Sequence, residues 1–216
     1  MEYFGKYTLT NFMSTQEIVD VSTWWTGNSR GGEFSPEHSK LWRCKALPST
    51  LFTAWRVVEN RIVSRVNLVR RGVAVENSLC CLCGEEESSC HLFFVCRFAW
   101  CIWCLCFEWL GVSFVFHKDP ESNFAQSRMS LASVSVNDVW GSIWVGIVSK
   151  IWVGIVSKIW NIRNSIIFNS GVADVFEVFA SVQVKVWSWI HAKSRFSYFP
   201  YSSWVLNPLD YMRLIM

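Results

Sequence analysis

The stretch CCLCGEEESSCHLFFVC, residues 80–96, decides how this chain folds. Cys80 and Cys83 have two residues between them, so both thiolates of one tight turn can face a single ion. His91 and Cys96 follow, with four residues between them. Three sulfurs and one imidazole from two chain segments suit a closed tetrahedral site with Zn–S bonds of about 2.3 Å. We therefore predict one structural Zn²⁺ bound by Cys80, Cys83, His91 and Cys96.

The spacing of the second ligand pair also predicts where a helix begins. Positions five apart on a regular helix point roughly 140° from each other, because each residue turns about 100°. We therefore expect His91 just before a helix and Cys96 in its first turn. An apolar run extends the helix to about Leu110, and Gly111 ends it. Gly84, directly after the first ligand pair, supplies the positive φ that a metal-binding turn often requires.

The remaining cysteines leave a second interpretation open. Eight of the nine cysteines lie between residues 80 and 106, whereas a secreted disulfide framework spreads its pairs along the chain. With no secretory signal evident, we expect metal binding in a reducing intracellular compartment. The alternative is a set of buried free thiols, and we assign Cys101, Cys104 and Cys106 to it. We interpret the acidic run of residues 85–87 as a solvated loop.

The composition predicts more apolar surface than a small domain easily buries. Its 216 residues are 51% hydrophobic, include fourteen Trp and carry a net charge of +3. Two apolar stretches, 92–116 and 139–162, are long enough for a membrane span of about 20 residues, but charged residues interrupt both. We expect a mainly α fold, a small helical domain organised around one zinc-binding turn with a long apolar C-terminal helix region, and no integral membrane association.

Positive charge concentrates in residues 40–71, which hold eight basic residues against the single acid Glu59. A helix is expected after Pro48, and a second, short one between an N-cap at Ser64 and Gly72. The block suits nucleic acid phosphates, and a solvated helix face is the equally weighted alternative. The candidate nucleic-acid-binding residues are Arg56, Arg61, Arg65, Arg70 and Arg71.

A tandem repeat interrupts the C-terminal half of the chain. Residues 143–150, IWVGIVSK, are copied identically as residues 151–158. On a helix, eight residues advance about 80° beyond two full turns, so Trp144, Trp152 and Trp160 drift around the axis. We expect this duplication to twist the apolar face of the helix away from a preformed core.

The residues around the cysteines resemble the zinc-binding domain of plant LINE-type reverse transcriptases, which lies downstream of the polymerase in a non-LTR retrotransposon polyprotein. The resemblance is strongest over residues 40–110. It rests on Trp42-Arg43, Pro48, Trp55-Arg56, Asn60-Arg61, Asn67-Leu68, Arg70-Arg71-Gly72, Cys-x2-Cys-Gly and His-Leu-Phe-Phe-x-Cys, and extends to Trp160, Arg163-Asn164 and Phe168. It implies that Cys80, Cys83, His91 and Cys96 bind zinc and that the basic helices contact template RNA or target DNA.

These observations predict a non-enzymatic protein in five segments. No paired carboxylates for polymerase or RNase H chemistry stand out. The predicted segments are a weakly structured lead-in (1–39), the reverse-transcriptase-type zinc-binding domain (40–116), a loop (117–138), a helical extension with the duplication (139–199) and a tail (200–216). RNA or DNA and the polymerase domain of a parent polyprotein are the expected partners. The alternative function is a metal-free helical protein–protein interaction module.

Overall fold

The chain folds into a mainly helical structure, as predicted. The computed structural model describes residues 41–44, 46–111, 117, 119–129, 138–192 and 200–208. For residues 126–129 and 138–145 it describes the backbone alone. The predicted lead-in, residues 1–39, and the last part of the tail lie outside the described residues. The helices are α4 (Pro48–Val58), α5 (Arg65–Arg70), the π-helical turn η1 (His91–Val95), α6 (Arg97–Leu110), α7 (Pro120–Met129), α8 (Asp138–Asn169), α9 (Val175–His191) and α10 (Tyr201–Leu206).

The helix ends follow from local chemistry. Pro48 opens α4, and the Ser64 hydroxyl accepts a hydrogen bond from the Asn67 N–H at the start of α5. Gly72, after α5, has φ +77°, and Gly111 closes α6 in the left-handed conformation. The predicted N-cap at Ser64 and the predicted stop at Gly111 are therefore confirmed.

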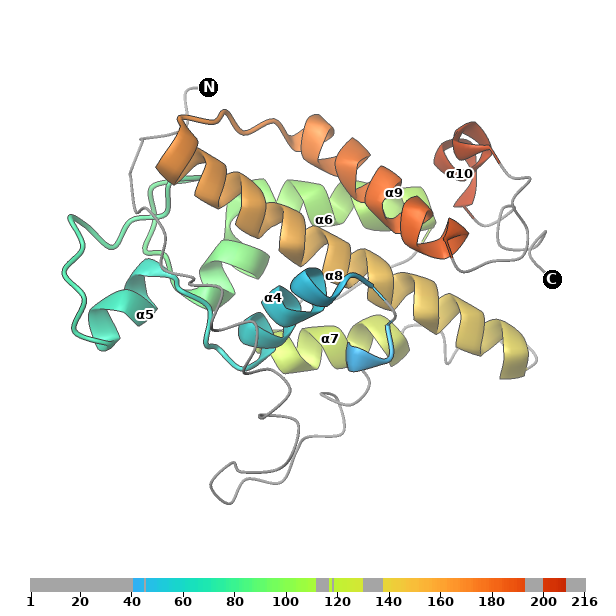
Figure 1. Cartoon of the computed structure of the whole chain (residues 1–216), viewed down its shortest axis with the longest axis horizontal. Helices are drawn as coiled ribbons and strands as arrows, with labels where there is room; N and C mark the ends of the chain where they lie inside the picture. The colour runs from blue at the N-terminus through green and yellow to red at the C-terminus, as the bar shows by residue number, and fades with distance from the viewer. Residues whose placement is uncertain are drawn as a thin grey trace, which may run out of the picture.

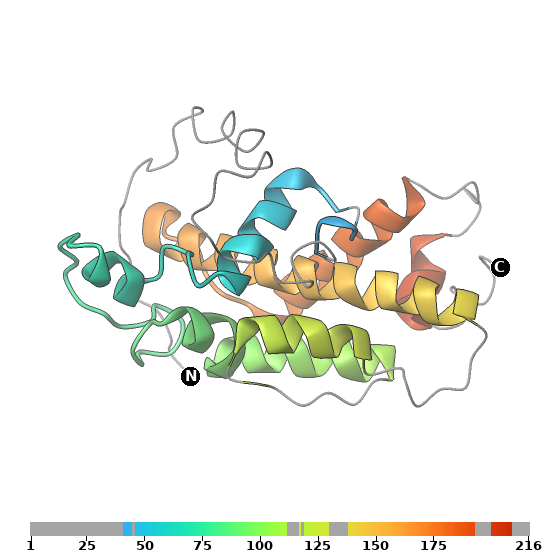
Figure 2. The same cartoon turned by 90° about the horizontal axis from the view of Figure 1, so that it is seen from below.

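The helix α8 lies at the centre of the fold. Helices α4, α6, α7 and α9 all pack against it, and Figures 1 and 2 show them on different sides of its axis. Seven consecutive residues, 151–157, are buried, so this part of α8 is enclosed on every side. One hydrophobic cluster joins the side chains of α4, α6, α8 and α9. None of the helices within the described ranges combines the length and apolar character needed to cross a membrane.

The expected effect of the duplication was wrong within the described residues. Ile147 and its copy Ile155 are both buried, as are Val148 and Val156. The reason is that the middle of α8 has no solvent face, so an 80° rotation between copies exposes no apolar stripe. The side chain of Trp144 is outside the described residues, whereas Trp152 is 1% exposed and Trp160 is half-buried.

Two segments expected to lack helices form them. The predicted loop 117–138 contains α7, which begins at Pro120 after Asp119, whose carboxylate accepts from the Ser122 N–H at 2.7 Å. The predicted tail contains α10, whose Trp204 is fully buried and donates from its indole N–H to the Gln183 carbonyl at 3.0 Å. Burial of one large aromatic side chain therefore holds α10 against α9.

Candidate metal centre

Four side chains converge where the segment 80–83 meets η1. The Sγ atoms of Cys80, Cys83 and Cys96 and a ring nitrogen of His91 all lie within 4.8 Å of one another. Cys83 Sγ is 3.0 Å from His91 Nε2. A tetrahedral zinc ion with Zn–S bonds near 2.3 Å places its ligand atoms about 3.8 Å apart. Small side-chain movements therefore suffice for all four to share one ion, and the group can hold one zinc ion as predicted.

A tight turn positions the first pair of ligands. The Gly84 N–H donates to the Cys80 carbonyl at 2.8 Å, and the Cys80 N–H donates to the Glu85 carbonyl at 2.6 Å. Gly84 has φ +85°, the conformation predicted for it, and a side chain there would be strained. Burial raises the pKa of the Cys83 thiol, and the backbone N–H of Glu85 partly offsets this rise. The turn therefore orients both thiols toward the same point.

A π-helical turn positions the second pair, and here the prediction needs correction. His91 lies in η1 rather than before a helix, and Cys96 is the N-cap residue of α6 rather than part of its first turn. The Cys96 N–H donates to the His91 carbonyl at 2.7 Å, an i to i+5 bond. A π turn therefore brings residues five apart to the same side, which a regular α-helix cannot do.

The thiols of Cys80 and Cys96 shift each other's pKa values in opposite directions. The hydrogen bond from Cys80 lowers the pKa of Cys96 to about 4, against the opposing effect of burial. His91 and the backbone N–H groups of Phe98 and Ala99 in α6 lower the pKa of Cys96 further. The Cys96 side chain nevertheless makes no helix-capping hydrogen bond. The same hydrogen bond, followed by burial, raises the pKa of Cys80. Because buried thiolates repel one another, a divalent cation would favour their joint deprotonation.

The other cysteines stay outside this group. Cys81 is buried, its Sγ donates to the Arg163 carbonyl at 3.9 Å, and burial raises its pKa to about 12. Cys106 is fully buried, as expected of a core thiol, and Cys101 is half-buried. Cys104 is exposed, so its assignment as a buried thiol was wrong: it lies on the solvent side of α6.

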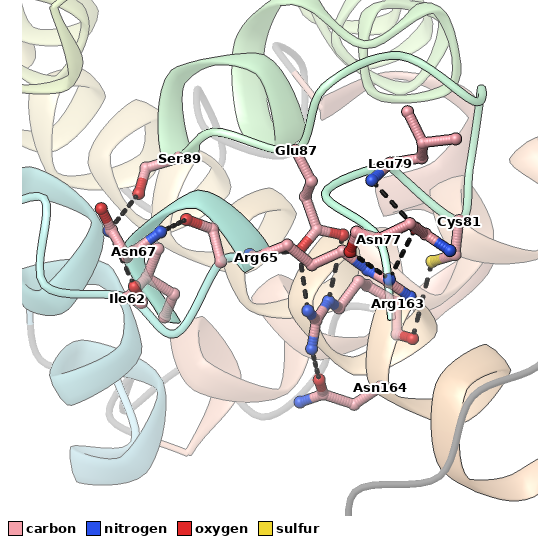
Figure 3. A network of polar contacts seen from close by, with 11 residues as sticks. Ile62, Arg65, Asn67, Asn77, Leu79, Cys81, Glu87, Ser89, Arg163 and Asn164 are labelled. Carbon is pink, nitrogen blue, oxygen red and sulfur yellow. Dashed lines mark hydrogen bonds and ion pairs between the residues drawn. The ribbon is translucent and has the colours of Figure 1, made fainter. Parts of the chain in front are cut away.

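Glu87 links the metal-binding turn to the rest of the fold (Figure 3). Its side chain is fully buried and its Oε1 accepts from Arg163 Nη2 of α8 at 2.7 Å. Arg163 Nε donates to the other oxygen at 3.3 Å, and the Arg65 N–H at the start of α5 donates to Oε1 at 3.0 Å. The prediction of a solvated acidic loop holds for Glu85 and Glu86, which are exposed, and was wrong for Glu87.

Asn67 forms a second polar link beside the turn. Its side-chain amide donates to the carbonyls of Asn60 and Ile62 and to the Ser89 hydroxyl, at 3.0, 2.9 and 3.2 Å. These bonds hold the α4–α5 connection against the segment that leads into His91. Neither Asn67 nor Arg163 was predicted to have this role; the signal available was the resemblance, which contains both residues without assigning them a partner.

The candidate basic residues divide into two groups. Arg61, Arg70 and Arg71 are exposed and Arg56 is half-buried. Arg65 is 5% exposed and donates from Nη1 to the Asn77 carbonyl and side-chain oxygen, both at 2.8 Å. Its proposal as a nucleic-acid contact is therefore corrected: its guanidinium bonds the loop before the metal-binding turn.

Comparison with known proteins agrees with a zinc site made of three cysteines and one histidine. Residues 20–103 match the family described as zinc-binding in reverse transcriptase, and this range contains all four candidate ligands. The resemblance is therefore confirmed at the level of that family, which is an accessory zinc-binding domain rather than the catalytic one. The match covers α4, α5 and η1 and ends within α6. No curated protein and no solved structure matches the chain.

Proposed function

We propose that this chain is a non-catalytic zinc-binding segment derived from a plant LINE-type retrotransposon reverse transcriptase. The convergence of three cysteines and one histidine within the family match carries the proposal. Four protein ligands complete a tetrahedral shell and leave no position for a reacting water, which is the pattern of structural rather than catalytic zinc. Cys80, Cys83, His91 and Cys96 would hold the ion, and the ion would cross-link the turn to η1.

Zinc content tests this proposal directly. Protein purified without chelator should contain about one zinc per chain, and Cys83→Ser should lose it. Cys104→Ser is the matched control, because Cys104 is exposed and lies outside the ligand group. A Cys83→Ser protein that keeps a full equivalent of zinc, or a wild-type protein that binds none at neutral pH, would contradict the assignment.

Nucleic acid is the partner that we propose for the basic helices. Arg56, Arg61, Arg70 and Arg71 support this, because arginine binds phosphate through several donors and all four retain solvent exposure. Replacing all four by Gln should weaken binding and reduce the slope of log affinity against log salt by about 0.7–0.9 for each phosphate that is no longer neutralised. Arg97→Gln, an exposed arginine on α6, is the control.

A protein–protein interaction module is the second candidate function. Exposed apolar side chains recur along the outer side of α9, where Phe176 is 71% and Val184 48% exposed. Such a stripe suits a partner helix or a neighbouring domain of a parent polyprotein. This candidate predicts that Phe176→Glu abolishes partner binding while zinc content and salt-dependent nucleic acid binding are unchanged.

A further inference from the structure

Two aromatic residues of α4, Phe52 and Trp55, each contact an arginine, Arg56 of the same helix and Arg61 of the loop that follows it. The rings of Phe52 and Trp55 are stacked, with centroids 5.6 Å apart and planes inclined by 27°. The Arg56 guanidinium lies 5.7 Å from the centre of the Phe52 ring, and that of Arg61 lies 5.7 Å from the Trp55 ring. Both residues are half-buried, and Trp55 also packs against the hydrophobic core. Each ring thus has one guanidinium over it.

The row continues from α4 to the end of α5. Arg71 Nη2 donates to the Arg61 carbonyl at 2.9 Å, which holds the C-terminal end of α5 against the loop that follows α4. Both arginines are exposed. The half-buried Glu59 lies 3.7 Å from Arg61, and an ion pair with one exposed partner at this distance is weak and salt-sensitive. We call Phe52, Trp55, Arg56, Arg61 and Arg71 the arginine–aromatic strip.

We propose that the arginine–aromatic strip binds single-stranded nucleic acid: phosphates draw the Arg56 and Arg61 guanidinium groups off the rings, and bases stack on the faces of Phe52 and Trp55 that these groups leave. The inference rests on the proposed nucleic-acid function and adds the strand state and the two aromatic contacts. Base–aromatic stacking needs an unpaired base with an open face, whereas the bases of a duplex are already stacked on one another.

The combination of arginines and aromatic rings in the strip supports this choice over an acidic peptide. Carboxylates would satisfy the arginines but would leave the stacked rings without a planar partner. A nucleotide offers both chemistries together, because a negative phosphate and a flat base repeat along the chain. The chemistry of the strip therefore suits a single strand better than an acidic peptide.

Binding of oligonucleotides by the full zinc-loaded chain tests the strip. The probes are uridine and thymidine homo-oligomers of about 12 nucleotides, and a duplex of equal length. Trp55→Leu and Phe52→Leu should each weaken single-strand binding about 5- to 150-fold, the effect of losing one stacked base, and leave duplex binding within about twofold. The uridine and thymidine arms separate RNA from DNA preference. Trp100→Leu on α6 is the control for loss of a surface Trp.

The possible failures are distinguishable. If wild-type protein binds no oligonucleotide, or binds with an affinity independent of salt, the proposed nucleic-acid function fails and the strip with it. If binding is salt-dependent but both leucine variants bind single strands like the wild type, the strip is overturned and the phosphate contacts stand. Equal losses for single strands and duplex, or full displacement by polyglutamate at equal charge, would also overturn it. Far-UV circular dichroism and zinc content verify that each variant is folded.

Discussion

The carboxylate of Glu87, at the end of the metal-binding turn, is bound by the guanidinium of Arg163, 76 residues later in α8. The two side chains are 0% and 3% exposed. Arg163 also lies 5.0 Å from the Trp160 ring and donates to the Asn164 side chain. The pair therefore fixes the register of α8 against the turn and connects the family-matched segment with the helices that follow it.

We expect Glu87→Gln to destabilise the protein by about 3–5 kcal/mol, because it leaves a buried guanidinium without a counter-charge. Urea denaturation of the zinc-loaded protein measures this difference. Glu86→Gln is the matched control, since the neighbouring side chain is exposed, and it should change stability by less than about 0.5 kcal/mol. Equal effects of the two substitutions would show that the pair does not support the fold.

Replacing both partners separates the pair from its neighbours. The double variant Glu87→Leu/Arg163→Met should be more stable than Glu87→Gln, because apolar replacement of both members of a buried ion pair removes the unpaired charge. Recovery should be incomplete, since the Arg65 N–H then loses its acceptor, which costs about 1–3 kcal/mol. The same urea titrations measure this difference. A double variant less stable than Glu87→Gln would contradict the prediction.

The features that the sequence predicted well are set by near neighbours. A Cys-x2-Cys-Gly turn, a serine N-cap and a glycine after a helix each depend on a few adjacent residues, and Gly84, Ser64 and Gly111 follow those rules. The mainly helical class follows in the same way from apolar periodicity. The ligand set of the metal centre follows from spacing combined with the resemblance.

The features that the sequence missed depend on distant contacts. Nothing within the run Glu85–Glu87 distinguishes the third glutamate, which is buried only because Arg163 lies opposite it. In the sequence, nothing distinguishes Arg65 from the exposed arginines of the basic block. It is buried in the fold, where its guanidinium bonds the loop that contains Asn77. The π turn at His91 likewise brings the ligand atoms of His91 and Cys96 to those of Cys80 and Cys83, which lie in a different chain segment. The division of the chain into five segments stays a prediction.

The tandem repeat provides a matched pair of glycines. A Cβ atom at Gly154 would lie 3.2 Å from Val186 and 3.6 Å from Val182 of α9. Among the described residues, one at Gly146 would meet only the end of Lys150, at 3.8 Å. Gly146→Ala should stabilise the protein by about 0.5–1 kcal/mol, the usual helix gain. Gly154→Ala should be less favourable, because α9 must move to admit the methyl group. Thermal denaturation compares the two, and equal gains would mean that α8 and α9 yield freely there.

Removing the metal should loosen one part of the molecule more than the rest. Chelation should speed amide exchange in residues 80–96, since the ion would join the turn to η1, while the centre of α8 stays protected by apolar burial. Hydrogen exchange with and without chelator measures this. Cys83→Ser protein should show the same fast exchange without chelator, and unchanged exchange in residues 80–96 after metal loss would contradict the cross-linking role.

Lys185 should make stability depend on pH in the alkaline range. Its ammonium donates to the Ser157 hydroxyl at 2.9 Å and lies 5.4 Å from the Trp189 ring. Burial, with a smaller contribution from Lys158, lowers its pKa from 10.5 to about 8. The unfolded chain therefore binds the proton more tightly than the folded one, and the contribution of Lys185 to the free energy of unfolding rises with pH between about 8 and 10.5.

Lys185→Met should remove that rise and make the protein more stable than the wild type at pH 7, because methionine keeps an unbranched apolar stem without the desolvated charge. Urea denaturation at several pH values from 7 to about 10 measures both effects. Lys150→Met, which removes the ammonium bonded to the Gly146 carbonyl, controls for the loss of a lysine from this helix pair. If the two variants share one pH profile with the wild type, burial does not disfavour the charge at Lys185.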